Sequence, residues 1–208
     1  MQLYYFPTPN GWKVSIALEE MSLPYELVIV NILEDEQLNP EFLKISPNGR
    51  IPTLIDDDGV MIFESGAILQ YLGRKSGSFY AESEARRTWI DSWVFWQMAG
   101  LGPMAGQLSW FIRVSQVEGR NPLDYGYPIH RYRKEVRRLY QVLETQLTGR
   151  EFICDAYTIA DMASWPWVHQ YHTQMGDIDE YPAVAGWYRR IAERAAVQRA
   201  LKLARPDL

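Results

Sequence analysis

The stretch GRIPTLIDDDGVMIFESGAILQYL, from Gly49 to Leu72, places two short strand-like segments, a turn and the start of a helix in direct succession. Thr53 to Ile55 and Val60 to Phe63 are largely apolar, and they flank DDDG, a sequence that favours a tight turn between strands. Apolar residues then recur at helical spacing from Ser65 to Lys75. A strand pair followed directly by a helix indicates a sheet with helices packed against it.

The residues before this stretch continue the same alternation back to the N-terminus. Gln2 to Phe6 and Tyr25 to Asn31 are rich in the aromatic and β-branched residues that strands favour. Trp12 to Met21 has the apolar spacing of a helix, and Pro40 to Ile45 is predicted as a short helix opened by proline. The predicted order β-α-β-α-β-β-α makes residues 1 to 76 an α/β domain with a mixed sheet.

Residues 84 to 208 are predicted to form a second, all-helical domain. Strand signals disappear, and five segments carry the helical apolar period: Arg86 to Met98, Tyr132 to Leu147, Thr158 to His169, Tyr181 to Ala192 and Ala196 to Leu203. The sequence AGLGPMAG interrupts or kinks the first of these helices between Gly100 and Gly106. TIAD predicts a helix start at which the Thr158 side chain accepts a hydrogen bond from the Asp161 amide.

Composition narrows the class of protein. A formal net charge of -5 argues against a protein that grips nucleic acid by its phosphates, since such binding needs an excess of Lys and Arg. No apolar run approaches the roughly 20 residues that span a bilayer, so no membrane partner is expected. Cys154 is the only cysteine, which excludes an internal disulfide and fits a reducing compartment. We therefore expect a cytoplasmic globular protein.

Pro52 precedes a short buried strand, where a missing backbone donor is tolerated. By frequency alone a trans Ile51-Pro52 bond is favoured, because only about 5–6% of X-Pro bonds in folded proteins are cis. If the bond is cis, the main-chain N–H and C=O of Ile51 turn outward and can pair with an extended, peptide-like ligand. The second interpretation predicts a small strand-addition site, and the motif FESGAILQYL that follows leads us to predict the cis bond.

Glu64 and Ser65 stand at the predicted start of a helix. Ser65 is placed as the N-cap, and the free N–H groups behind it, together with the helix dipole, favour a carboxylate. Glu64 can accept from an ammonium group, so this short stretch can hold both charges of an α-amino acid. The alternative is that Ser65 only caps the helix and Glu64 only complements its dipole.

Taken together, these motifs resemble the glutathione transferase superfamily along essentially the whole chain. The resemblance is carried by RIPTL and ESGAILQYL in the first half and by TIADMASWPW in the second. PTPNGWKV, EFLKISPNGRIPTL and FWQMAGLGPM are most similar to the bacterial Nu class and its fungal nitrogen-regulator relative. The resemblance implies a thioredoxin-like domain followed by an all-α domain, and glutathione bound by Ile51, Pro52, Glu64 and Ser65.

In such a site the ligand supplies the thiol, and the protein has only to lower the pKa of that thiol. Thr8 and Asn10 lie at the start of the first helix, where donated hydrogen bonds and the helix N-terminus favour a thiolate. Tyr5 is the alternative donor, because a phenol also donates. Ser15 is placed inside the helix and is discounted. Cys154 lies outside this loop and is predicted to be a small buried residue.

Further residues are assigned by the resemblance to the edges of the site. Lys13 and Arg50 are candidates for the glycine carboxylate of glutathione, with a solvated surface role as the alternative for each, and Asn48 lies beside them in a turn. The second-substrate cleft is assigned to Trp12, Trp110 and Phe111. Arg131 is predicted on a solvated helix face, with contact to a partner chain's ligand as the alternative. His169 and His172 lack carboxylate or cysteine companions, so no metal is expected.

The resemblance implies a homodimeric, glutathione-dependent enzyme of detoxification that reduces small disulfides by thiol exchange. Conjugation of glutathione to hydrophobic electrophiles is the main alternative. A second alternative is a regulatory protein that binds glutathione without turnover. The partners expected are therefore glutathione, a small disulfide or electrophile, and a second copy of the chain.

Overall fold

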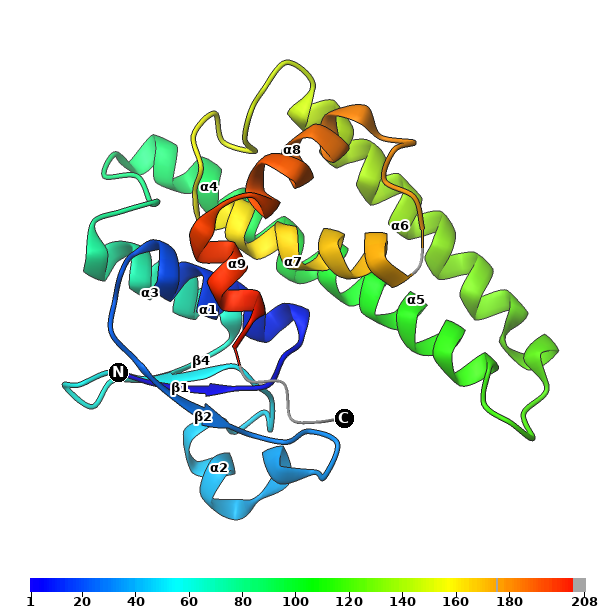
Figure 1. Cartoon of the computed structure of the whole chain (residues 1–208), viewed down its shortest axis with the longest axis horizontal. Helices are drawn as coiled ribbons and strands as arrows, with labels where there is room; N and C mark the ends of the chain where they lie inside the picture. The colour runs from blue at the N-terminus through cyan, green and yellow to red at the C-terminus, as the bar shows by residue number, and fades with distance from the viewer. Residues whose placement is uncertain (175, 204–208) are drawn as a thin grey trace.

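The computed structural model describes residues 1–174 and 176–203 and shows two lobes packed together (Figure 1). One lobe holds the whole sheet and ends with a helix at Ser76, and the other begins at Glu84 and consists of helices. The predicted fold, a thioredoxin-like α/β half followed by an all-α half, is confirmed. Within the described ranges, no helix combines the length and the apolar character needed to span a bilayer.

The sheet has four strands in the order β2-β1-β3-β4. β1 (Gln2–Tyr5) runs parallel to β2 (Glu26–Ile29) and antiparallel to β3 (Thr53–Ile55), and β3 pairs antiparallel with β4 (Met61–Phe63). The predicted turn between β3 and β4 is confirmed, since the Asp56 N–H donates to the Val60 carbonyl at 2.9 Å. Each predicted strand is present, with its ends shortened by at most two residues.

Three helices flank the sheet in the first lobe. α1 (Pro9–Glu20) and α3 (Ser65–Ser76) lie between the sheet and the helical lobe, whereas α2 (Pro40–Ile45) lies on the opposite face (Figure 1). A short turn of 3-10 helix, Glu36–Leu38, precedes α2.

Helix α1 is buried on nearly every side. Val14, Ile16, Ala17 and Leu18 are each 0% exposed, because the helix packs on the sheet and also against α7 and α9. The polar residues Lys13 and Ser15, on the same helix, are buried as well.

The second lobe contains six α-helices within the described residues: α4 (Glu84–Trp96), α5 (Gly102–Ser115), α6 (Gly126–Leu147), α7 (Ile159–Gln174), α8 (Pro182–Ala192) and α9 (Ala195–Leu201). A turn of π-helix, Gln97–Leu101, links α4 to α5, and a 3-10 turn, Pro122–Tyr125, precedes α6. The predicted interruption after the first helix is confirmed in kind but begins earlier than expected. Regular helix resumes at Gly102, because Pro103 falls in the first turn, where its missing N–H is tolerated.

The start of α7 is capped differently from the predicted arrangement. The Thr158 hydroxyl accepts from the Ala160 N–H at 3.3 Å, whereas the Asp161 amide bonds to the Thr158 carbonyl. The buried Asp161 carboxylate accepts from the Thr158 and Ile153 N–H groups and from the Trp187 indole. Burial raises the pKa of Asp161 to about 6, although these hydrogen bonds act to lower it.

Two arginines form ion pairs between the last helix and the end of α1. Arg194 forms two hydrogen bonds with the Glu20 carboxylate, at 2.6 and 2.8 Å, and lies over the Tyr157 ring. Arg199 bonds Glu19 at 2.6 Å. The bidentate pair fixes direction as well as distance, so α9 holds α1 in a defined position against the helical lobe.

Candidate active site between the two lobes

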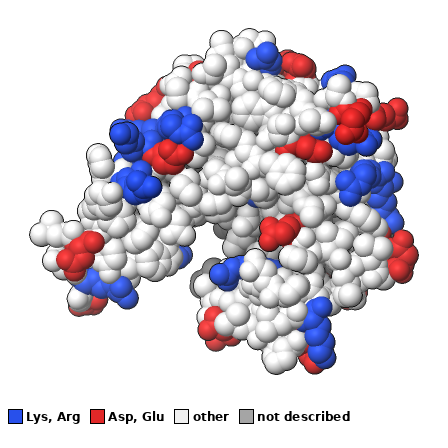
Figure 2. Space-filling model, turned by 180° about the vertical axis from the view of Figure 1, so that it is seen from behind, with Lys and Arg blue, Asp and Glu red and all other residues white. Residues whose placement is uncertain are grey.

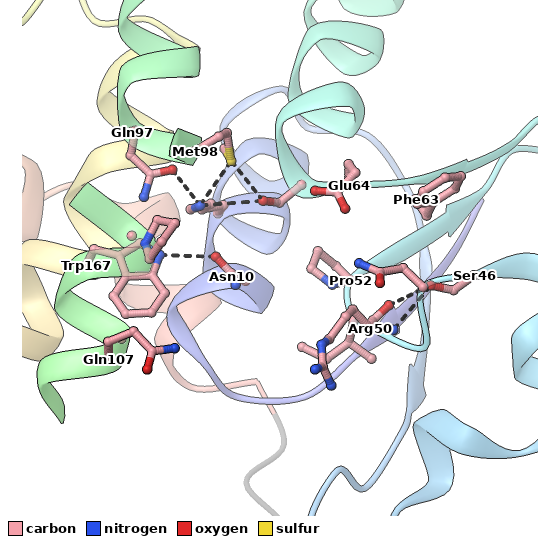
Figure 3. Close-up of a pocket in the computed structure, with 17 residues that line it drawn as sticks. Asn10, Ser46, Arg50, Pro52, Phe63, Glu64, Gln97, Met98, Gln107 and Trp167 are labelled. Carbon is pink, nitrogen blue, oxygen red and sulfur yellow. Dashed lines mark hydrogen bonds between the residues drawn. The ribbon is translucent and has the colours of Figure 1, made fainter. Parts of the chain in front are cut away.

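A cavity of about 430 Å³ lies where the two lobes meet. Its walls come from α1, the loop before β3, the start of α3, the π-helical turn, α5 and α7 (Figure 3). The space-filling view shows the molecule hollowed between the lobes, with a few charged side chains at the rim of the hollow (Figure 2). The position at the lobe boundary is a common one for a small-molecule site.

All seven residues predicted to bind glutathione line this cavity, together with the predicted thiol donor Asn10. They come from three separate stretches of the chain and are Asn10, Lys13, Asn48, Arg50, Ile51, Pro52, Glu64 and Ser65. The Ile51-Pro52 peptide bond is cis, as the second interpretation of this stretch predicted. Ile51 lies outside the sheet ladder, whose pairing begins at Thr53, so its main-chain groups are not used by a neighbouring strand.

The start of α3 differs by one residue from the prediction. Glu64, with φ 71°, occupies the cap position, and Ser65 is the first residue of the helix. The first bond within the helix runs from the Ile68 N–H to the Glu64 carbonyl at 3.0 Å. The preceding N–H groups therefore lack a partner within the helix, and they form the positive end of α3 beside the cavity.

Lys13 is buried, which excludes the solvated role considered for it. Its side chain is 1% exposed, and Nζ donates to Gln97 Oε1 at 2.7 Å and contacts Ser65 Oγ at 3.5 Å. Burial lowers the pKa of Lys13 to about 7, against the opposing effect of the Glu64 carboxylate. Lys13 thus joins both lobes at the α3 end of the cavity.

Asn10 lies in the first turn of α1, about one turn before Lys13 on the same helix. Its side-chain oxygen accepts from the Trp167 indole N–H at 3.1 Å, so a residue of the helical lobe contacts the predicted thiol donor (Figure 3). Asn10 therefore meets the helical lobe directly, as Lys13 does through Gln97.

Thr8 does not line this cavity. It is the N-cap of α1, and its hydroxyl oxygen accepts from the Gly11 N–H at 3.4 Å. Together with Trp12 it lines a second hollow, of about 440 Å³, on the side of α5 that carries Ser109 and Arg113. The structure thus separates the two predicted thiol donors onto different surfaces.

Tyr5, the alternative donor, is 0% exposed. A Cβ built at Gly11 would lie 2.9 Å from the Tyr5 ring, so glycine at this position lets α1 pack on the phenol. The ring belongs to the core and does not line the cavity.

The aromatic residues assigned to the second-substrate cleft are not brought together. Trp110 is 45% exposed and packs edge-on against Phe111, which stacks on Tyr132. Neither Trp110 nor Phe111 lines the cavity, and Trp12 lies at the second hollow. Arg131 is exposed on α6, as predicted.

Cys154 takes no part in the cavity and is buried, as predicted. Burial raises the pKa of its thiol to about 12, and the Asp161 carboxylate acts in the same direction. A thiol with so high a pKa is a poor nucleophile. The described residues contain no group of His, Cys, Asp and Glu suited to holding a metal ion.

The helical lobe contributes cavity residues that the sequence interpretation missed, chiefly Gln97, Met98, Gln107 and Trp167. Gln97 is fully buried, and its Nε2 has no hydrogen-bond partner among the described residues. Gln97 precedes the glycine-rich turn, and Trp167 ends the motif TIADMASWPW. Nothing in the sequence around either residue indicates that its side chain faces the first lobe. Ser46 was also missed; its hydroxyl bonds the Arg50 main chain and shapes the loop before β3.

Family models match both lobes. The glutathione S-transferase N-terminal domain matches residues 8–75, and the glutathione S-transferase C-terminal domain matches residues 127–190. The chain therefore belongs to the glutathione S-transferase family.

Individual relatives cover nearly all of the chain. Disulfide-bond oxidoreductase YfcG of Escherichia coli K12 is 42% identical, covering 97% of this chain and 94% of its own length. A glutathione transferase of Burkholderia graminis, solved with two glutathione molecules per subunit, has a TM-score of 0.89 at 42% identity, covering 98% of this chain and 88% of its own. A glutathione transferase of Pseudomonas putida, solved with one glutathione disulfide per subunit, has a TM-score of 0.88 at 40% identity, covering 98% and 91%.

Proposed function

We propose that this protein is a glutathione-dependent enzyme that reduces small disulfides. The observation that carries the proposal is a single cavity that contains an amide donor, Asn10, and a helix N-terminus with Glu64 and Ser65, but no cysteine. Similarity to a disulfide-bond oxidoreductase and to structures holding glutathione or its disulfide supports the proposal.

Glutathione fits the polarity of the cavity from end to end. Its α-carboxylate lies at the positive end of α3 with Ser65, and its α-ammonium group meets the Glu64 carboxylate. The cysteinyl unit pairs with the Ile51 main chain, and Arg50 is the candidate for the glycine carboxylate. Lys13, which contacts Ser65, belongs at the γ-glutamyl end and not at the glycine end first considered for it.

The thiol of glutathione is activated at the start of α1. An unperturbed thiol has a pKa near 8.5, and hydrogen bonds to the anion lower that value. The Asn10 amide donates to the sulfur. The Thr8 hydroxyl lies outside the cavity and caps α1, so it supports the helix start that holds Asn10. The positive end of α1 favours the thiolate as well.

The proposed reaction is thiol–disulfide exchange. The glutathione thiolate attacks one sulfur of the substrate disulfide, forms a mixed disulfide and releases the other half as a thiolate. A second glutathione thiolate then attacks the glutathionyl sulfur of the mixed disulfide, giving glutathione disulfide and the second product thiolate. Two glutathione thiols supply the two electrons, and the product thiolates take up the protons that these thiols lose.

The domain bounds, the assembly, the location and the role are proposed as follows. Residues 1–76 and 84–208 are proposed as the two domains, and a homodimer is proposed because Trp89, Phe95 and Phe63 are large apolar side chains that are 50%, 62% and 40% exposed. A cytoplasmic location fits the single reduced cysteine, and detoxification would be the role of such an activity.

A coupled assay tests the proposed function. Glutathione, bis(2-hydroxyethyl) disulfide, NADPH and glutathione reductase are mixed with the protein, and NADPH consumption is followed. We expect saturable turnover that needs both glutathione and the disulfide and persists in Cys154→Ala. Conjugation of an electrophile such as 1-chloro-2,4-dinitrobenzene without disulfide turnover would favour the transferase alternative, and glutathione binding without either reaction would favour a regulator.

A further inference from the structure

One hydrogen bond joins the helical lobe to the predicted thiol donor. The Trp167 indole N–H, on α7, lies 3.1 Å from the side-chain oxygen of Asn10, on α1, and Figure 3 shows the two groups facing one another. An indole N–H can only donate, so the amide atom that it meets must be the oxygen and not the nitrogen. Trp167 therefore decides which way round the Asn10 carboxamide lies.

The orientation of this carboxamide decides its effect on a bound thiolate. The oxygen and the nitrogen are the two branches of one planar group, so the amino group points away from the atom that holds the oxygen. Asn10 and Trp167 both line the cavity. With the oxygen held by the indole, the amino group is the branch left for the ligand, and it donates to a sulfur anion that the oxygen would repel.

The indole itself is held in place by the helical lobe. Trp167 is 9% exposed, and it lies against two glycines one turn apart on α5. A Cβ at Gly102 would lie 3.2 Å from Trp167 Nε1, and a Cβ at Gly106 would lie 3.1 Å from its ring. Because glycine has no side chain, α5 packs closely against the indole at these two positions. The indole N–H is therefore already in position before the ligand binds.

We propose that Trp167 is a positioning residue that keeps the amino group of Asn10 directed at the sulfur of bound glutathione. The inference rests on the proposed function, since it requires Asn10 to stabilise the thiolate. It gives the helical lobe a part in thiol activation, although the thiol donor itself belongs to the first lobe.

The test removes the indole N–H and follows the pKa of the bound thiol by the ultraviolet absorbance of the thiolate. In Trp167→Phe the carboxamide loses its fixed orientation, and we expect the pKa to rise by about 0.3–1 unit, less than in Asn10→Ala. Disulfide turnover below that pKa should fall about two- to tenfold. In the Asn10→Ala background, Trp167→Phe should produce no further rise.

A second variant keeps the shape of the side chain at position 167 nearly constant. Phenylalanine is smaller than tryptophan, so β-(3-benzothienyl)alanine placed at position 167 replaces N–H by sulfur at nearly the same shape, and it should give the same rise. Trp165→Phe is the matched control, because its indole lies on the same helix but donates to the Tyr188 carbonyl. The control should lower the thermal midpoint of unfolding and leave the thiol pKa in place.

The outcomes distinguish the positioning role of Trp167 from the proposed function of the enzyme. If Asn10→Ala raises the thiol pKa but neither change at position 167 does, the positioning role is wrong and the proposed function stands. A rise that persists in the Asn10→Ala background also overturns the positioning role, because Trp167 would then act by another route. If Asn10→Ala leaves the pKa unchanged, the role of Asn10 fails and the inference fails with it.

Discussion

Two neighbouring parts of the cavity are built from different kinds of groups. At the charged end, the Glu64 carboxylate and the buried Lys13 amine lie beside the N-terminus of α3. At the neutral end, the first turn of α1, the Asn10 carboxamide and the Trp167 indole carry no charge. The charged end suits the zwitterionic γ-glutamyl group, whereas the neutral end can lower the pKa of a thiol by donating a hydrogen bond to its anion. Binding and activation are therefore expected to respond to different substitutions.

The largest effect is expected at the charged end. Glu64→Ala removes the partner of the ligand's ammonium group, and hydrogen bonds to charged groups contribute about 1.5–3 kcal/mol. The Kd for glutathione, measured by calorimetry, should rise about 10- to 100-fold. Glu82→Ala, outside the cavity, serves as the control and should leave the Kd unchanged. A large change in the bound thiol pKa in Glu64→Ala would contradict the separation of the two ends.

At the neutral end, Asn10→Ala should act on the thiol and spare binding. Loss of one donor to the thiolate should raise the pKa of the bound thiol by about one to two units. Turnover near neutral pH falls accordingly, while the Kd for glutathione changes little. The absorbance titration of the bound thiolate gives the pKa directly. An unchanged titration with a much weaker Kd would show that Asn10 is a binding residue instead.

Proton uptake by Lys13 on ligand binding gives a further test of the charged end. The pKa of Lys13 is lowered to about 7 by burial, so at pH 8 most of this lysine is neutral in the free protein. A carboxylate bound at the adjacent end of α3 favours the ammonium form and raises that pKa. Binding at pH 8 should therefore take up a fraction of a proton, falling toward zero below pH 6, where Lys13 is already charged.

S-methylglutathione is the ligand for this measurement, because it has no thiol whose ionisation would release protons. Calorimetry in two buffers with different ionisation enthalpies gives the number of protons taken up. Lys13→Met should abolish the uptake. Uptake that survives this substitution would assign the proton to another group.

The smallest effect on the thiol is expected from Thr8. Its hydroxyl caps α1 and lies outside the cavity, so Thr8→Val should cost about 0.5–2 kcal/mol of unfolding free energy, measured by urea denaturation. The pKa of the bound thiol should rise by less than in Asn10→Ala. If Thr8→Val instead produces the larger rise, the hydroxyl reaches the sulfur and the amide is secondary.

The first lobe could be predicted from sequence because its signals are local. A turn between two apolar segments, a proline before a strand and a small polar residue at a helix start each report the conformation of their own neighbourhood. These signals gave the local conformation at Pro52, Glu64 and Ser65, and the resemblance to glutathione transferases placed the three residues in one site. The error at Glu64 was a shift of one residue, because a cap with positive φ shows no distinctive residue type in this sequence.

The contributions of the second lobe could not be predicted, because they depend on how the lobes pack. Gln97 and Trp167 reach the cavity only after the π-helical turn and α7 have been placed beside α1. The burial of Lys13 could not be predicted for the same reason, since a lysine on a helix is usually solvated and here its amine bonds Gln97 of the other lobe. Trp110 and Phe111 were candidates for the second-substrate cleft, but the sequence does not specify the direction in which their side chains point.

The burial of α1 on all sides also affects the order in which the chain can assemble during synthesis. α1 leaves the ribosome before α7 and α9, yet these two helices complete one of its surfaces, and Arg194 and Arg199 pair with Glu20 and Glu19. Until α7 and α9 have been synthesised, apolar side chains of α1 such as Ile16 and Leu18 lack part of their packing. The first lobe therefore cannot complete its packing until the last helix of the second lobe has been made.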